Sequence, residues 1–216
     1  MSKRLSIDFV SDVSCPWCAI GLKGLQAALA RLEGVVEVDI HFQPFELNPQ
    51  MGPEGEDLEE HISRKYGAAP EQMAQTREVI RARAAAVGFT MAVDKRRRIH
   101  NTFNAHRLLH WAGEVDQARQ LALKLALFEA YFTRGEDPSD TDVLLAAVAQ
   151  AGLDAEEART ILAGDRYAAE TRGAEQLWQS RGIQSVPAAI VNGRYLISGG
   201  QPPEAYENAL KKIATS

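Results

Sequence analysis

The stretch LSIDFVSDVSCPWCAIGLKGLQAALARLEGVVEVDIHF, residues 5–42, predicts the first half of an α/β fold. Apolar and polar residues alternate over residues 5–9, which is typical of a strand. Apolar residues then recur at intervals of three and four over residues 18–32, as on one face of a helix, and Gly34 ends that helix. Alternation returns over residues 36–42. A strand, a helix of about five turns and a second strand form a βαβ unit, for which we expect a right-handed crossover.

The middle of the chain changes character. Residues 44–56 are rich in proline and glycine, which is typical of a linker, and the chain is then almost wholly helical as far as about residue 181. The expected helices are residues 58–66, 71–87, 102–112, 117–133, 141–151, 155–162 and 167–181.

Strand signals return near the end of the chain. Residues 188–191 and 195–198 flank Asn192-Gly193, the strongest two-residue hairpin signal. Two prolines then suit the first turn of a last helix over residues 204–213.

These elements predict one fold class and three segments. A hairpin alone is marginally stable, so we expect both ends of the chain to join in one sheet. The fold class is therefore α/β, a βαβ unit and a ββα unit separated by a large all-helical insertion domain. We expect residues 1–50 to form the N-terminal part, residues 51–170 the insertion, and residues 171–216 the C-terminal part, with the order αββα.

Composition limits the partners. The chain has 216 residues, a hydrophobic fraction of 45% and a net charge of -5, so no overall basic field attracts nucleic acid or an anionic membrane. The first residues, MSKRLSIDFVSDV, lack the apolar run of a signal peptide, so we expect a cytoplasmic protein. Because the cytosol keeps thiols reduced, a C-x-x-C pair there indicates redox chemistry or metal binding.

Cys15 and Cys18, the two cysteines of the chain, enclose Pro16 and Trp17 at the start of the first helix. Unpaired backbone N–H groups at a helix start stabilise a thiolate, so we expect the pKa of Cys15 to fall. Cys18 lies one turn later on the apolar face, within disulfide reach. We therefore expect Cys15 to attack a disulfide and Cys18 to resolve the mixed disulfide.

A zinc site is the main alternative for this pair. It needs two further ligands, and the sequence has no second C-x-x-C. His106 and His110 lie four apart on a predicted helix, but no glutamate follows His106 as in H-E-x-x-H. We predict no metal site, and two inert core cysteines are an equally minor alternative.

A second motif, GIQSVPAAIVNGRYLISGGQ, covers residues 182–201. A cis bond between Val186 and Pro187 would leave the backbone N–H and C=O of Val186 pointing outward beside the sulfur of Cys15, where an extended substrate could pair with them. The backbone at Gly200 and Gln201 either binds a carboxylate such as that of glutathione or forms a simple turn and cap.

Four segments together resemble one protein family. They are SDVSCPWCAIG, FQPFELNP, NTFNAHRL at residues 101–108 and SVPAAIVNGRYLISGGQ. In this order and spacing they resemble the DsbA family of thiol–disulfide oxidoreductases, and within it the FrnE-like branch. The resemblance implies a thioredoxin fold with a helical insertion, a cis bond at Pro187, a redox-active Cys15–Cys18 pair and a substrate groove between the insertion and the thioredoxin half.

Two functional alternatives remain open. The same superfamily contains glutathione-dependent isomerases of hydroxychromene carboxylates and kappa-class glutathione transferases, which usually have serine at the first cysteine position and lack the second cysteine. The presence of both Cys15 and Cys18 favours the dithiol activity. A non-catalytic binding or chaperone module, using the surface near Trp17 and Val186, is the other alternative. Secreted DsbA proteins carry signal peptides and a Pro-His dipeptide, and both are missing here.

We expect no bound cofactor, with glutathione as a candidate co-substrate. The expected partners are thiol- or disulfide-containing proteins or small thiols, with no nucleic acid and no membrane, and the expected assembly is a monomer or homodimer.

Asn104 either contacts the substrate or holds the insertion in place, and the basic run over residues 95–98 either lies in solvent or docks acidic substrates. The predicted substrate-binding residues are Pro16, Trp17, Val186, Pro187, Gly200, Gln201 and Asn104.

Overall fold

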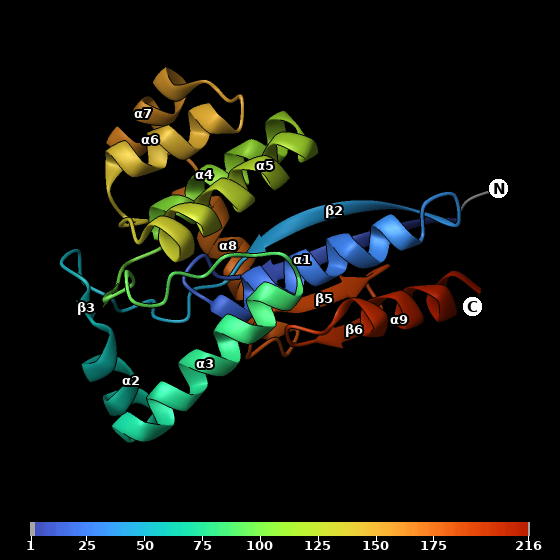
Figure 1. Ribbon diagram of the computed structural model, residues 1–216. Helices are drawn as coiled ribbons and strands as arrows, with labels where there is room; N and C mark the ends of the chain where they lie inside the picture. Colours follow the sequence, from blue (N-terminus) through green and yellow to red (C-terminus); the bar gives the residue numbers. More distant parts are fainter. Residues whose placement is uncertain (1–2, 216) are drawn as a thin grey trace.

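The two ends of the chain form one four-stranded sheet in the computed structural model, which describes residues 3–215. The strand order is β2 (Val36–Pro44), β1 (Lys3–Ser11), β5 (Ala188–Val191) and β6 (Tyr195–Ser198). β1 is parallel to β2 and antiparallel to β5, and β5 is antiparallel to β6. β5, from the C-terminal end of the chain, lies directly beside β1, and Figure 1 shows the two ends of the chain joined in this sheet. The predicted joining of both ends in one sheet is therefore confirmed.

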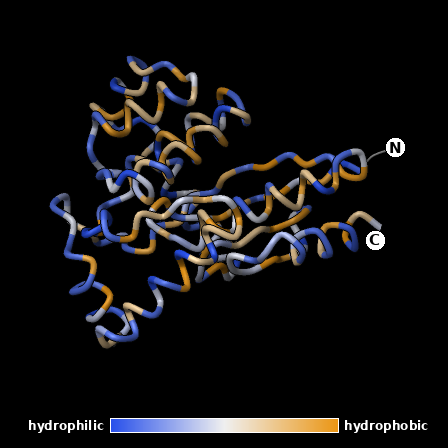
Figure 2. Tube along the Cα trace, in the orientation of Figure 1, coloured by the Kyte–Doolittle hydropathy of each residue, from blue (hydrophilic) through white to orange (hydrophobic). Residues whose placement is uncertain are grey.

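The sheet separates two apolar cores. Helices α1 (Pro16–Arg31) and α9 (Pro203–Thr215) pack against each other, and their apolar residues share a core with Phe9 of β1. Val10, the next residue of β1, belongs instead to a second core with Trp178. Successive strand residues point to opposite faces of a sheet, so both faces of β1 are covered by helices. Figure 2 shows apolar and polar residues mixed along the helices, as one-sided burial requires.

The segment between β2 and β5 is mostly helical. Helices α4 to α8 gather beside the sheet, whereas α2 and α3 lie apart from them (Figure 1). No helix within residues 3–215 is long and apolar enough to cross a bilayer. The elements in chain order are β3 (Glu56–Asp57), α2 (Leu58–Tyr66), α3 (Pro70–Ala86), β4 (Arg98–Ile99), α4 (Phe103–Val115), α5 (Gln117–Phe128), the π-helix η1 (Glu129–Arg134), α6 (Thr141–Gln150), α7 (Ala155–Ala163) and α8 (Ala168–Ser180).

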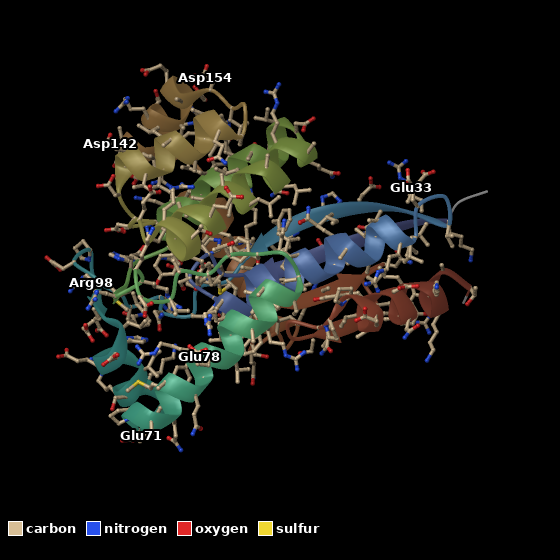
Figure 3. The ribbon with its side chains drawn as sticks, viewed as in Figure 1. Glu33, Glu71, Glu78, Arg98, Asp142 and Asp154 are labelled. Atoms are coloured by element: carbon tan, nitrogen blue, oxygen red, sulfur yellow. The ribbon has the colours of Figure 1, made fainter. Side chains whose placement is uncertain are left out.

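Aspartates begin several of these helices. The carboxylates of Asp57, Asp140 and Asp154 accept hydrogen bonds from the first N–H groups of α2, α6 and α7. Each such cap stabilises its helix by about 1 kcal/mol. Figure 3 shows Asp142 and Asp154 on the outer surface of the insertion, so these helix starts lie in solvent.

One predicted helix, over residues 117–133, is divided in the structure. The α-helix α5 ends at Phe128 and continues as the π-helix η1, which Gly135 closes with a φ of 74°. The wider π turn accompanies burial of the consecutive residues Ala130, Tyr131 and Phe132. The short strands β3 and β4 were not predicted either, because two residues cannot show an alternating pattern.

A glycine in α1 tests the packing of the last helix against the first. A Cβ atom at Gly24 would lie 2.7 Å from the carbonyl oxygen of Gln201, whereas one at Gly173 in α8 would meet nothing within 4 Å. We expect Gly24→Ala to lower the free energy of unfolding by about 1–3 kcal/mol through overpacking. Gly173→Ala, the matched control, should raise it by about 1 kcal/mol because alanine favours the helix. Urea denaturation measures both; a stabilised Gly24→Ala variant would contradict this packing.

Candidate active site

Cys15 occupies the start of α1. It is the N-cap residue, with an extended backbone (φ −89°, ψ 114°), and Pro16 is the first helical residue. The carbonyl of Cys15 accepts hydrogen bonds from the N–H groups of Cys18 at 3.1 Å and Ala19 at 3.4 Å. The first N–H groups of a helix carry partial positive charge, which stabilises a thiolate placed beside them. The predicted position of Cys15 at the helix start is confirmed.

The two thiols have opposite electrostatic environments. A hydrogen bond from the Cys18 thiol lowers the pKa of Cys15, and the backbone N–H groups of Cys18 and Trp17 act in the same direction against the effect of burial. Burial raises the pKa of Cys18 well above its ordinary value, and the neighbouring Cys15 adds to this effect. Both cysteines are free thiols in this structure. Cys15 is therefore the sulfur that ionises first.

A cis-proline loop covers the sulfur of Cys15. The Val186–Pro187 peptide bond is cis, as the family resemblance implied. The thiol of Cys15 donates to the carbonyl oxygen of Val186, with 3.7 Å between sulfur and oxygen. A Cβ atom at Gly21 would lie 3.1 Å from Cγ of Pro187, so glycine at this position allows the loop to approach α1. The backbone of Val186 thus lies beside the reactive sulfur.

An open groove of about 680 Å³ begins at Cys15. Ser14, Pro16, Trp17 and Val186 line it on the side of the sheet. The facing walls come from residues 45–48 and from helices α2 and α3. Because α2 and α3 follow residue 51, the groove lies where the predicted insertion meets the predicted thioredoxin half. Its volume is within the range of small-molecule sites.

Trp17 both borders the groove and packs against the protein core. The indole is half-buried, lines the groove beside Cys15 and also packs against the core that α1 shares with the sheet. One part of the ring is therefore available to a ligand, while the rest is held in place by protein.

Four predicted binding residues lie outside the lining of this groove: Pro187, Gly200, Gln201 and Asn104. A Cβ atom at Gly200 would lie 2.7 Å from the carbonyl oxygen of Trp17, so Gly200 permits close packing on α1. The side-chain amide of Gln201 donates to the carbonyl of Ser198 at 2.7 Å. Asn104 accepts a hydrogen bond from Arg107 at 2.9 Å. These contacts are structural, and a role in substrate binding for the four residues remains a prediction.

Asp12 is the centre of a buried polar cluster behind Cys15. Its carboxylate accepts hydrogen bonds from the N–H of Leu47 at 2.7 Å and from the N–H and hydroxyl of Ser14 at 3.2 and 3.0 Å, and it lies 3.4 Å from Nε2 of His106. Burial alone would raise the pKa of Asp12, but these partners, His106 foremost, lower it to about 2. Asp12 therefore stays ionised and fastens the β2–β3 loop and α4 to the start of α1.

Lys124 of α5 supplies a buried cation to the same region. The side chain is 1% exposed, and its ammonium lies 5.1 Å from the centre of the Phe128 ring. Burial lowers the pKa of Lys124 to about 8, although the charges of Cys18, Asp12 and Cys15 favour the ammonium form. Sequence reasoning assigned this helix to the insertion core and missed the residue. The signal was a single lysine inside the apolar run LALKLALF.

Glu46 was also missed. It is 5% exposed, lines the groove and forms an ion pair with Arg172, which also bonds Glu175 at 2.8 Å. Burial raises the pKa of Glu46, and Arg172 opposes that effect.

Within residues 3–215 no group of three or more His, Cys, Asp or Glu side chains could hold a metal ion.

Comparison with known proteins identifies the family. The sequence profile of the DSBA-like thioredoxin domain matches residues 6–211. The chain belongs to the DSBA-like thioredoxin domain family. The matched residues include the Cys15–Cys18 pair, the cis-proline loop and the helical insertion.

Three relatives illustrate the range of this similarity. A probable DsbA oxidoreductase of Streptomyces coelicolor is 32% identical, with a TM-score of 0.88 over 98% of this chain and 91% of that one. The uncharacterized protein YwbO of Bacillus subtilis is 24% identical over 94% of both chains. A 2-hydroxychromene-2-carboxylate isomerase is 15% identical, with a TM-score of 0.71 over 96% of this chain and 95% of that one, which shows a shared fold.

Asp12 predicts a pH dependence of stability for this DSBA-like domain. The pKa of Asp12 falls from 3.8 to about 2 on folding, so its ionisation stabilises the native state above pH 3.8 and that contribution is lost as the pH falls towards 2. The shift corresponds to about 2 kcal/mol. We expect Asp12→Asn to lower the free energy of unfolding at pH 7 by at least this amount, and the difference to shrink between pH 4 and pH 2.

Urea denaturation across this pH range measures the effect. Asp39→Asn is the matched control, because Asp39 pairs with Arg4 at 2.8 Å on the surface, where ion pairs contribute little. An Asp12→Asn difference that stays constant from pH 7 to pH 2 would show that the carboxylate charge is not the stabilising feature.

The thiol of Cys18 predicts a second effect, on the pKa of Cys15. Alanine at position 18 removes the donor that lowers this pKa, whereas serine keeps a hydroxyl donor there. We therefore expect the pKa of Cys15 to rise more in Cys18→Ala than in Cys18→Ser. The pH dependence of alkylation by iodoacetamide reports this pKa directly. Equal pKa values in the two variants would refute the hydrogen-bond explanation.

Proposed function

We propose that this protein is a thiol–disulfide oxidoreductase of the FrnE-like branch, working through a Cys15-Pro-Trp-Cys18 dithiol centre. The observation that carries the proposal is the asymmetry of the two sulfurs. Cys15, with a lowered pKa, borders an open groove, while Cys18, with a raised pKa, is 0% exposed behind it. A nucleophile and a protected resolving thiol need this arrangement.

The reaction proceeds in two exchanges. The Cys15 thiolate attacks one sulfur of a substrate disulfide, a new Cys15–substrate disulfide forms, and the other substrate sulfur leaves as a thiolate. Cys18 then loses its proton and attacks the sulfur of Cys15, which forms the Cys15–Cys18 disulfide and releases the second substrate thiolate. The substrate is reduced by two electrons and the enzyme is oxidised. The reverse sequence oxidises a dithiol substrate, and the reduction potential of the pair decides the direction.

The resolving step depends on buried charge. Cys18 must ionise in an apolar environment, which is costly without a nearby cation. The charge of Lys124 lowers the pKa of Cys18 and so opposes the effect of burial. Lys124 thus favours the thiolate form of Cys18. It does so from α5, a helix of the insertion.

The cis-proline loop positions the substrate. The Val186 carbonyl accepts a hydrogen bond from the Cys15 thiol in the reduced protein. Ionisation of Cys15 removes that proton and frees the carbonyl for an N–H of an extended substrate, as in strand addition. Pro16 and Trp17 form the adjacent wall of the groove.

The compartment and partners are further parts of the proposal. We place the protein in the cytoplasm, acting on disulfides of proteins or of small thiols, with glutathione as a candidate co-substrate. The four family-like segments support the FrnE-like assignment, and the net charge of -5 favours partners other than nucleic acid.

Substitution of each cysteine tests the activity. We expect Cys15→Ser to lower the rate of insulin disulfide reduction at least about 100-fold, because the remaining thiol, Cys18, is buried and has a raised pKa. Cys18→Ser should accumulate mixed disulfides at Cys15, detectable by mass spectrometry. An unchanged rate in Cys15→Ser would refute the proposal. Full turnover of Cys18→Ser with saturable glutathione binding would instead favour the glutathione-dependent isomerase or transferase alternative.

A further inference from the structure

The basic run at residues 95–98 divides in the structure into side chains with different surroundings. Arg98 donates to the backbone carbonyls of Glu54 at 2.7 Å and Gly55 at 3.3 Å, and Figure 3 shows it at the outer end of the molecule beside β3. Arg97 is exposed and lies outside the groove lining. Arg96 is the member of the run that lines the groove containing Cys15.

Aromatic rings hold the guanidinium of Arg96 in place. Its central carbon lies 5.0 Å from the centre of the Tyr131 ring and 5.2 Å from that of Phe132. Both rings are buried in η1, and the Tyr131 hydroxyl donates to the carbonyl of Arg98 at 2.9 Å. The Nε atom of Arg96 is buried without a hydrogen-bond partner. The buried Nε is out of reach of a ligand, but a guanidinium held over two rings at the groove wall is suited to recognition of a carboxylate.

Neighbouring carboxylates do not neutralise Arg96. On its other side it borders a polar pocket that also contains Asp57, Glu59 and Asp94. Asp57 caps α2, Glu59 pairs with Arg77 at 2.8 Å, and Asp94 is exposed. In the part of the chain that the structure describes, none of the three forms a salt bridge with Arg96.

Lys65 adds a second positive charge to the groove. Its ammonium donates to the carbonyl of Leu47 and to the side-chain oxygen of Asn48, both at 2.7 Å. These partners are neutral and do not compensate the ammonium charge, although burial lowers the pKa of Lys65. The acidic lining residue Glu46 is paired with Arg172. The groove is therefore locally positive in a chain whose net charge is -5.

We propose that the groove selects small-molecule disulfides that carry carboxylates, and that Arg96 and Lys65 are its specificity-determining residues. This inference rests on the proposed function. A carboxylate of the substrate pairs with Arg96 while its disulfide lies against Cys15. The Cys15 thiolate then displaces one carboxylate-bearing thiolate, and Cys18 displaces the other as the enzyme disulfide forms. The groove volume of about 680 Å³ suits a ligand of this size.

Matched disulfides separate charge selection from thiol exchange. The reduced protein is mixed with 3,3′-dithiodipropionate, a dianion, or with 2-hydroxyethyl disulfide, which is neutral. Each single-turnover rate is divided by that of dithiothreitol with the same disulfide, which compensates for differences in the leaving thiol. The resulting dianion-to-neutral ratio is the measure of selection.

We expect Arg96→Gln to lower this ratio about tenfold, the effect of one lost charge-assisted contact. Arg96→Lys keeps the charge and should retain most of the ratio. Arg97→Gln is the control, because it removes the same charge from the adjacent exposed residue, and it should leave the ratio unchanged. Thermal unfolding of each variant verifies folding.

Salt provides a test in the unaltered protein. Raising the ionic strength from about 0.02 M to about 0.5 M should slow the reaction with the dianion, because it screens the pairing with Arg96 and Lys65. A response to the overall negative charge would have the opposite sign. The inference is wrong if Arg96→Gln has the same dianion-to-neutral ratio as the unaltered protein and salt accelerates the reaction with the dianion. The exchange activity would still stand in that case. If the protein reacts with neither disulfide faster than Cys15→Ser does, the proposed function itself fails.

Discussion

The site depends on the antiparallel pairing of β1 with β5. This pairing joins two parts of the chain that are far apart in sequence, and it brings the Cys15 sulfur to the carbonyl of Val186, 171 residues away. The other features of the site lie around this contact. A hydrogen bond from the Cys18 thiol and the N–H groups of the helix start lower the pKa of Cys15, and the cis-proline loop provides the backbone beside it. Without the pairing, the groove beside Cys15 would lack the wall that Val186 provides.

The insertion is linked to the redox pair by buried charge. Asp12 fastens the β2–β3 loop and α4 through hydrogen bonds to Leu47 and His106, and Lys124 brings a cation from α5. A buried ion is tolerated only when its charge is compensated, so these groups restrict how the helices can sit on the sheet. The same groups influence the ionisation of Cys18. Fold stability and chemistry therefore rest on shared residues.

The sequence predicted the architecture well where local signals were strong. Helix α2 begins and ends where the pattern placed it, and the four-stranded sheet follows from alternating strands and the Asn192-Gly193 turn. The π-helix after Phe128 was not predicted, because its turn results from tertiary packing. Arg96 and Lys124 show the same limit for the site. The sequence shows Arg96 only as part of a basic run and Lys124 only as part of an apolar helix. The fold is needed to show that Arg96 lines the groove and that Lys124 lies near the sulfurs.

In the proposed reaction Cys15 is the reactive thiol and Cys18 the protected one. Reaction of the reduced protein with less than one equivalent of iodoacetamide at pH 7, followed by peptide mass spectrometry, measures this difference. We expect the label to lie almost entirely on Cys15, because its pKa is lowered and it borders the groove. Equal labelling of the two cysteines, or preferential labelling of Cys18, would contradict it.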